Sequence, residues 1–339
     1  MPATPPQERT EPADLCTASG SLNPAALGWS RRPNLRCNLT GGWPRNKRWH
    51  YWGIMGDDAF FSPAIADIDY LAFGAVYVLD FAANRLAQTA AQRLLPRKRL
   101  PLPVGVTGKA GFHARHFDLA IDDKEDQVTI AFDGRLAKLP LTARFTVTRP
   151  PEHESLNVVV PWSERRFQFT SKQVALPASG TLTWGDKNFT FAPQRTWAVL
   201  DYGRGRWPYR SVWNWAAAAG RIGPDMVGLN FGGQWTDHTG AHENGVFING
   251  RLYPLHEDVV FTPDRTDFMR PWRVHTPGSG NVALAFTPFH DRTERINLGL
   301  IAANTHQCFG HFTGTVRVDN RPLEIGHLPG WAEECRWRW

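Results

Sequence analysis

Apolar residues recur at every second position in most segments of this chain, and this period of two constrains the fold more than any other feature. In "LTARFTVT" (141–148) apolar and polar residues alternate without a break, and in "NVALAF" (281–286) the three larger apolar residues fall at alternate positions. Successive side chains of a strand point to opposite faces, so this alternation indicates half-buried β-strands. Many short segments of this kind predict an all-β barrel or sandwich.

Turn residues between the alternating segments predict tight hairpins. The predicted turns are Asp133-Gly134, Gly185-Asp186, Asn249-Gly250 and Asp319-Asn320. Asn, Asp and Gly accept the positive φ that such turns need. Helical signal is thin: residues 82–95 fit a short helix, but they also fit an exposed strand or loop.

Composition places the chain among globular proteins. Its 339 residues are 42% hydrophobic and 21% charged, with a formal net charge of +6. The basic clusters at 45–48 and 97–99 are short, so we expect solvated loops and no nucleic-acid partner. No apolar run is long enough for a transmembrane segment. The opening residues 1–15 lack the apolar core of a secretory signal, so a cytoplasmic location is expected.

The cysteines and the absent motifs exclude several chemistries. Cys16, Cys37, Cys308 and Cys335 fit no zinc spacing, and we expect them to be reduced. No P-loop, dinucleotide-binding, zinc-protease or serine-hydrolase motif is present. The sequence therefore predicts no metal and no cofactor.

Proline-bearing stretches divide the chain. We expect a flexible tail over 1–28, an N-terminal β-domain over 29–179, and a C-terminal β-domain over 180–339 that carries the site.

The stretch "LDYGRGRWPYRSVWNWAAAAG" (200–220) combines charged and aromatic residues more densely than any other. A strand over 210–218 would place Trp213 and Trp215 on one face. The glycine-rich residues 201–208 are predicted to form a loop at the rim. Such a loop would direct polar side chains across a barrel mouth, or hold them in a salt-bridge lattice. These side chains are Asp201, Arg204, Arg206 and Arg210.

Five motifs of the chain are distinctive when taken together. They are "LNPAALGWSRRP" (22–33), "KRWHYWGI" (47–54), "LDYGRGRWPYRSVWNWA" (200–216), "HENGVFINGRLYPL" (242–255) and "QCFGHFTGTV" (307–316). Their combination resembles the bacterial DUF2804 family, whose name carries no assigned chemistry. The resemblance runs from about residue 15 to the end of the chain.

A more distant resemblance joins the acid-glycine element and the W-x-W strand to the group of hydroxyneurosporene synthase, AttH and tocopherol cyclase. This resemblance implies two tandem lipocalin-like antiparallel β-barrels, or strongly curved sheets, with little helix. It also implies hydration, cyclisation or rearrangement of a hydrophobic isoprenoid or polyketide. Asp201 matches the group's acid, whereas arginines stand where its histidine is expected.

Such chemistry needs a proton donor and a wall that stabilises a cation. A carboxyl in an apolar barrel has a raised pKa, and indole faces attract positive charge. Asp201 and Glu243 are the candidate catalytic residues. The candidate ligand-binding residues are Arg204, Tyr209, Arg210, Trp213, Trp215, Asn230, Asn244 and His311.

Structural roles are open for the same residues. Glu243 and Asn244 can cap a turn, Asn230 can satisfy backbone groups, and the tryptophans can fill a core. We expect Glu333 to pair with Arg336 or Arg338.

The expected partner is a hydrophobic small molecule such as an isoprenoid, lipid or polyketide, which the protein binds and converts by acid/base chemistry. Glycoside hydrolysis or carbohydrate binding is an alternative, with a saccharide between paired carboxylates in a tryptophan-lined cleft. A non-catalytic lipid or pigment carrier is another. A carboxyl facing an apolar cavity would favour conversion. An open polar groove would favour the glycosidase.

Overall fold

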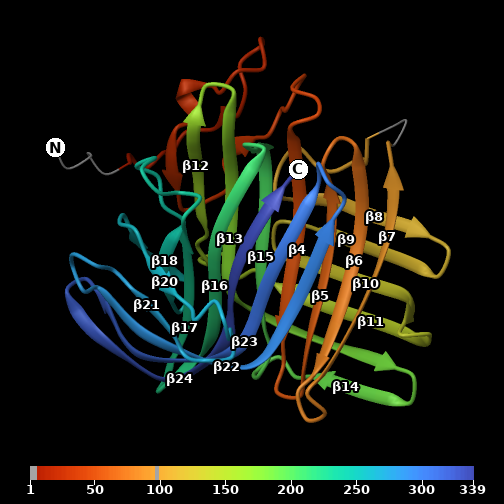
Figure 1. Cartoon of the computed structure of the whole chain (residues 1–339). Helices are drawn as coiled ribbons and strands as arrows, with labels where there is room; N and C mark the ends of the chain where they lie inside the picture. The colour runs from red at the N-terminus through yellow and green to blue at the C-terminus, as the bar shows by residue number, and fades with distance from the viewer. Residues whose placement is uncertain (1–5, 96–98) are drawn as a thin grey trace.

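The computed structural model describes residues 6–95 and 99–339. Strands dominate this part of the chain, and its one helical element is a short 3-10 turn at Pro24–Ala26. Two large antiparallel sheets form the molecule, with a small parallel pair of β1 (Ala13–Asp14) and β3 (Leu35–Arg36) beside them. The predicted all-β fold of strongly curved sheets with little helix is confirmed (Figure 1).

The first sheet curls until its two ends approach each other. Its path is β7-β6-β5-β4-β15-β13-β11-β10-β9-β8. Arg93 at one end donates a hydrogen bond of 2.8 Å to the carbonyl oxygen of His113 at the other. The strands are β4 (Asn46–Met55), β5 (Ala59–Asp67), β6 (Leu71–Asp80), β7 (Arg85–Leu94), β8 (Gly108–Ala114), β9 (Phe117–Asp123), β10 (Gln127–Leu136), β11 (Leu139–Thr148), β13 (Arg166–Trp184) and β15 (Trp197–Arg206). Three shorter strands branch from it, namely β2 (Gly28–Ser30), β12 (Leu156–Ser163) and β14 (Lys187–Phe191).

The second sheet is an open, curled half-barrel with the order β19-β18-β17-β16-β24-β23-β22-β21-β20. In Figure 1 its strands β16, β24 and β23 pass across the middle of the molecule, next to β13, β15 and β4. The strands are β16 (Arg210–Ile222), β17 (Asp225–Gly233), β18 (Asn244–Ile248), β19 (Arg251–Leu255), β20 (Val260–Thr262), β21 (Trp272–His275), β22 (Val282–Asn297), β23 (Ala302–Val318) and β24 (Arg321–Arg338).

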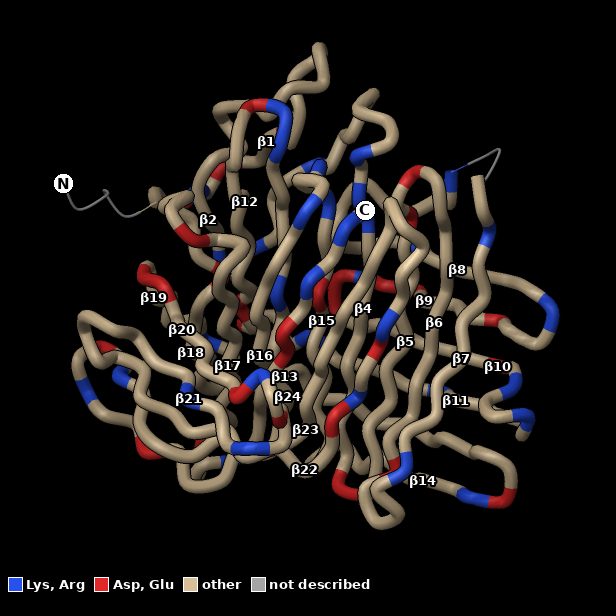
Figure 2. The backbone as a smooth tube through the Cα atoms, in the orientation of Figure 1, with Lys and Arg blue, Asp and Glu red and all other residues tan. Residues whose placement is uncertain are grey.

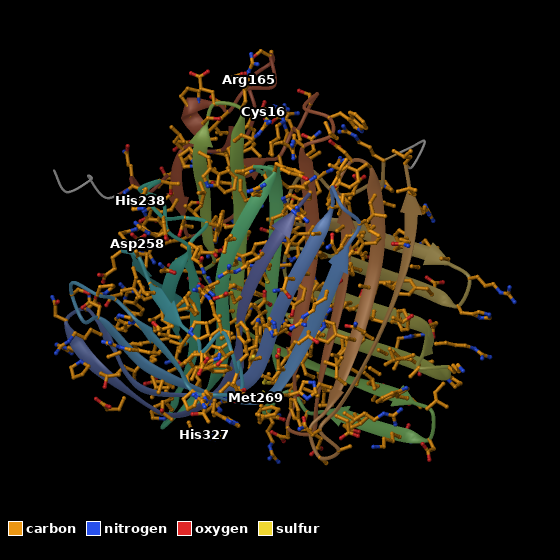
Figure 3. All side chains as sticks on the ribbon, in the orientation of Figure 1. Cys16, Arg165, His238, Asp258, Met269 and His327 are labelled. Carbon is orange, nitrogen blue, oxygen red and sulfur yellow. The ribbon has the colours of Figure 1, made fainter. Side chains whose placement is uncertain are left out.

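Alternation along the strands creates a core inside each sheet and a third core between them. On β15, Leu200 and Tyr202 fill the interior of the first sheet, whereas Trp197 and Val199 belong to the middle core. Residues of the second sheet, Trp331 among them, complete that middle core. Both faces of the central strands are therefore buried, as Figure 3 shows by the dense side chains on either side of them.

Three of the four predicted hairpin turns are confirmed, at residues 185–186, 249–250 and 319–320. The turn predicted at Asp133-Gly134 is wrong, because β10 continues through it and pairs with β11 as far as Leu136. The chain turns instead at Ala137 and Lys138, both with positive φ. Residues 85–94 form strand β7, so no helix forms there.

The expected tail and domain boundary do not match the structure. Residues 6–28 pack against the first sheet, with Leu15 and Ala26 fully buried, while residues 1–5 lie outside the described part. The boundary expected at 179/180 falls inside β13, and the chain changes sheets at 207–209.

Two segments predicted as loops are strands. Residues 201–206 belong to β15, where the strand tolerates glycine because Trp49 packs directly against Gly203. Residues 46–48 begin β4, and Lys47 is fully buried near the ring of Tyr70. The basic cluster at 97–99 lies mostly outside the described residues.

Charged residues of both signs are interspersed along the two sheets, and Figure 2 shows no continuous basic stripe on this side. All four cysteines are buried and free. In the described ranges, no helix has the length and apolar character needed to span a membrane.

Candidate active site

A cavity of about 580 Å³ lies between the two sheets, not inside the C-terminal half alone. Its lining is mostly apolar and comes from β4, β5, β6, β7, β13 and β15 on one side, and from β16, β22, β23 and β24 on the other. The site was predicted in the C-terminal domain. The structure instead divides it between the sheets, because the interior of each sheet is filled by its own core.

The register of the first sheet explains why the space is hollow. Asp201 on β15 is directly opposite Tyr51 on β4, which is opposite Ala64 on β5. The same row continues through Ala75 on β6 and Ala90 on β7. Polar and aromatic side chains on the inner strands thus give way to methyl groups on the outer ones, and the missing side-chain volume is the cavity.

Lys172 on β13 joins the two predicted catalytic carboxyls. Its Nζ lies 2.8 Å from Asp201 Oδ1 and 3.1 Å from Glu243 Oε2. Asp201 is its cross-strand partner, whereas Glu243 reaches it from the second sheet, just before β18. Thr170 also donates a hydrogen bond to Asp201 Oδ1 at 3.2 Å. Two carboxyls from different sheets therefore share one buried ammonium group.

Burial and charge act in opposite directions on this group. Burial raises the pKa of Glu243 to about 6, although Lys172 lowers it. The two carboxylates outweigh burial at Lys172, so its pKa is raised and the ammonium remains charged. The Nζ of Lys172 also lies 4.4 Å from the ring centroid of Trp215, a cation–π contact.

Indole rings form one wall of the cavity. Trp213 and Trp215 face it from β16, as the strand prediction requires. Trp207 stacks on Trp235 at 5.3 Å between ring centroids, and Trp235 Nε1 donates to Glu243 Oε1 at 2.6 Å. The further indoles of this wall are Trp49, Trp337 and Trp339.

A second polar row crosses the second sheet. Trp215 is opposite Glu333 on β24, which is opposite Gln307 on β23, which is opposite Arg292 on β22. Gln307 Nε2 donates to Glu333 Oε1 at 2.7 Å. Burial raises the pKa of Glu333 to about 7. The expected pairing of Glu333 with Arg336 or Arg338 is wrong, since the neighbouring Glu334 contacts Arg336.

The ten predicted site residues separate into three sets. Asp201, Glu243, Trp213 and Trp215 line the cavity. Asn230 lies behind it, where it accepts a hydrogen bond from Trp215 Nε1 at 3.0 Å and donates to the carbonyl oxygen of Glu243 at 2.6 Å.

The other five lie away from the cavity lining. Arg204 projects toward the first-sheet core, where it donates to the carbonyl oxygens of Trp49 and Pro103. Asn244 occupies the face of β18 opposite to Glu243 and binds the carbonyl oxygen of Glu257. His311 stacks on His327 at 3.7 Å. Tyr209 and Arg210 precede the buried part of β16; Tyr209 is half-buried and Arg210 is exposed.

Sequence reasoning missed Lys172, Gln307, Arg292 and Glu333. A signal for Lys172 was present in "FQFTSK" (167–172), where Phe167 and Phe169 share one face of a strand and Gln168, Thr170 and Lys172 share the other. No local pattern marks Glu333, because the adjacent Glu334 shares its charge and faces elsewhere.

The described part of the chain contains no group of three His, Cys, Asp or Glu side chains that could hold a metal ion. The chemistry that this arrangement offers is proton transfer by carboxyls in a low-dielectric space beside indole faces.

Solved structures share the fold at low sequence identity. CghA, solved with Sch210972, is 12% identical with a TM-score of 0.54, and the match covers 87% of this chain and 89% of that one. An AttH candidate from Nitrosomonas europaea is 15% identical with a TM-score of 0.54, covering 87% and 93%. Kievitone hydratase from Nectria haematococca is 12% identical with a TM-score of 0.50, covering 87% and 92%.

No curated protein matches the chain by sequence. One family model does match, over residues 6–339, and it describes a domain of unknown function. The chain therefore belongs to the DUF2804 family.

Proposed function

We propose that this protein converts a hydrophobic small molecule by acid/base chemistry in the cavity between its sheets. One observation carries the proposal: Asp201 and Glu243 share the buried ammonium of Lys172 at the wall of a mostly apolar cavity of about 580 Å³. An apolar cavity of this size with a few convergent polar groups is typical of a small-molecule site.

The two carboxyls suit different roles. Glu243 is the acid, because burial raises its pKa to about 6 even though the ammonium of Lys172 lies 3.1 Å from its Oε2. Asp201 is the base, since Lys172 and Thr170 both stabilise its anion and its side chain is 15% exposed. Lys172 holds the two at a fixed separation.

A hydration illustrates the proton balance. Glu243 gives a proton to one carbon of a double bond, water adds to the other carbon, and Asp201 accepts the proton that the water loses. Isomerisation needs the same two transfers without water. Positive charge that develops on the substrate would be stabilised by the faces of Trp213 and Trp215.

The neighbours support a reaction of this class. One solved structure of the same fold is kievitone hydratase, and another is CghA with Sch210972. The apolar lining disfavours the saccharide alternative, which calls for a polar groove. The raised pKa of Glu243 favours conversion over a carrier, which needs no acid.

The test uses the purified full-length protein and an extract of apolar metabolites. We expect mass spectrometry to show one compound consumed and another formed, with the same mass or differing by one water. Asp201→Asn should lower the rate at least about 100-fold, the low end of what a positioned acid or base contributes.

Glu334→Gln is the matched control, because Glu334 is a similarly buried carboxyl that faces away from the cavity lining. It should convert the compound at the rate of the unmodified protein. Equal rates for Asp201→Asn and the unmodified protein, or no conversion by either, would contradict the proposal.

A further inference from the structure

The cavity contains more acids than bases. Asp201, Glu243, Glu294 and Glu333 line it, against Lys172, Arg292 and Arg338. Lys172 is paired with Asp201, and Arg292 is paired with Glu294 at 3.2 Å. Four carboxylates and three cations would leave one net negative charge in a mostly apolar space. Since burying an uncompensated charge is costly, the remaining acid is better accommodated as a neutral group.

Glu333 is the acid with no ion-pair partner. Across the described ranges, no Lys, Arg or His nitrogen lies within 4.0 Å of its carboxylate. The residue is nevertheless buried, with 9% of its surface exposed. Its two hydrogen-bonding neighbours are Gln307 and the thiol of Cys335, whose Sγ lies 3.7 Å from Oε2. Neutral donors of this kind do not balance a full negative charge.

A closed ring of hydrogen bonds fixes the orientation of Gln307. Tyr77 donates to Gln307 Oε1 at 2.8 Å, so its only proton is used. The 2.8 Å contact between the two tyrosine hydroxyls must then be donated by Tyr51, which accepts from Gln307 Nε2 at 3.3 Å. The second Nε2 proton goes to Glu333 Oε1, so a proton carried by Glu333 lies on Oε2.

We propose that Glu333 is a second proton-donating residue of the cavity, and that the substrate is an uncharged molecule with an oxygen acceptor beside it. This inference rests on the proposed function and adds the substrate class. Lys172 and Arg292 are already paired. Arg338 lies five residues beyond Glu333 on β24, about 16 Å along the strand, so it cannot bind a carboxylate placed beside Glu333. A carbonyl, hydroxyl or ether oxygen can accept the hydrogen bond of a neutral acid, whereas an anion would add to the charge that burial opposes.

The charged and titratable groups around Glu333 agree with this role. Arg292 on β22 and Lys172 on β13 lower its pKa, whereas burial and Asp201 on β15 raise it. Tyr51 on β4, Tyr77 on β6 and Cys335 on β24 complete its surroundings, and burial raises the pKa of each of them. These three groups therefore stay neutral beside it.

The binding test compares two naphthalene probes on the full chain by isothermal titration calorimetry. Acetylnaphthalene is an uncharged ketone and naphthoate is its carboxylate counterpart. We expect the ketone to bind at least about ten-fold more tightly than the carboxylate. The ketone accepts a buried hydrogen bond, whereas naphthoate must bury a negative charge. Equal or tighter binding of naphthoate would overturn the inference.

The variants identify the donor. Glu333→Leu should weaken ketone binding about ten-fold, and Glu333→Gln, which keeps an N–H donor, should weaken it less. Glu334→Gln is the off-site control and should match the unmodified protein. Ketone binding that is unchanged in Glu333→Leu would overturn the role of Glu333.

An infrared measurement covers the case in which the leucine variant does not fold. Below the pKa of about 7, the protonated-carboxyl band should lose one component in Glu333→Gln but not in Glu334→Gln. An unchanged band in Glu333→Gln would contradict a neutral Glu333. Because these readouts measure binding and protonation, their failure would leave the turnover test of Asp201 unaffected. Failure of both probes to bind the unmodified protein would count against both proposals.

Discussion

Lys172 is the residue on which the electrostatics of the cavity depend. It is 4% exposed and contacts carboxyls from two sheets, so its charge is balanced within the protein and not by water. A buried ion pair adds little net stability when it is intact, but the loss of one partner leaves an uncompensated charge.

Lys172→Met should therefore destabilise the fold by about 3 kcal/mol at neutral pH. Adding Glu243→Gln to this variant should recover part of the loss, because one of the two stranded carboxylates is removed. Urea unfolding measures both changes. Lys109→Met is the control: its side chain is 83% exposed and 3.7 Å from Asp122, so we expect a change within about 0.5 kcal/mol. Equal effects of the two lysine substitutions would contradict this view.

The raised pKa of Glu333 predicts how the stability of the fold depends on pH. Burial raises its pKa from the ordinary 4.5 to about 7, so the folded protein holds this proton after the unfolded chain has released it. Stability then falls as pH rises from 4.5 to about 7, and the loss is complete above that pH.

Glu333→Gln removes the titration. Relative to the unmodified protein, the variant should gain about 3 kcal/mol of unfolding free energy between pH 4 and pH 8. Denaturant unfolding at both pH values measures the difference. A constant difference between the two proteins across this range would show that Glu333 has an ordinary pKa.

Strand β15 shows how one element serves two cores. Its odd positions, from Trp197 to Asp201, face the middle core and cavity, and its even positions face the interior of the first sheet. Gly203 continues the odd row where the indole of Trp49 crosses the strand. Glycine is needed there for close approach of a side chain and not for a turn.

Gly203→Ala tests this close approach. The added Cβ would lie 2.1 Å from Cε2 of Trp49, so the indole must move toward the cavity. We expect a loss of about 1–3 kcal/mol, typical of overpacking, together with a change in the tryptophan near-ultraviolet spectrum. Gly326→Ala in β24 is the matched strand substitution. Its Cβ would meet nothing within 4 Å, so it should be tolerated. Equal tolerance of both would contradict the packing.

The whole molecule is held together by the core between its sheets. That core takes Val158, Trp197 and Val199 from the first sheet and Trp215, Phe309 and Trp331 from the second. Hydrogen bonds also cross the same interface, as between Tyr77 and Gln307. Neither sheet can bury this face alone.

The two sheets should therefore unfold together. Differential scanning calorimetry should give one transition whose calorimetric enthalpy equals the van't Hoff enthalpy. Tryptophan fluorescence and far-ultraviolet circular dichroism should report the same midpoint. Two resolved transitions would mean that the sheets are independent units.

The sequence alone determined the local structure of the protein. Alternation predicted strands, and it placed Trp213 and Trp215 on one face of β16, because the direction of a strand side chain depends only on its neighbours in the chain. The turn prediction at Asp133-Gly134 failed, because β10 continues to pair with β11 through this favourable turn sequence. Local signals thus determined most elements but not each boundary.

Tertiary structure alone decided which polar groups meet. Lys172, Asp201 and Glu243 lie on β13, on β15 and just before β18, and their meeting depends on sheet order and on how one sheet packs on the other. The choice between Glu333 and Glu334 likewise depends on which face of β24 covers the cavity. Contacts of this kind join residues far apart in the chain, so no local pattern encodes them.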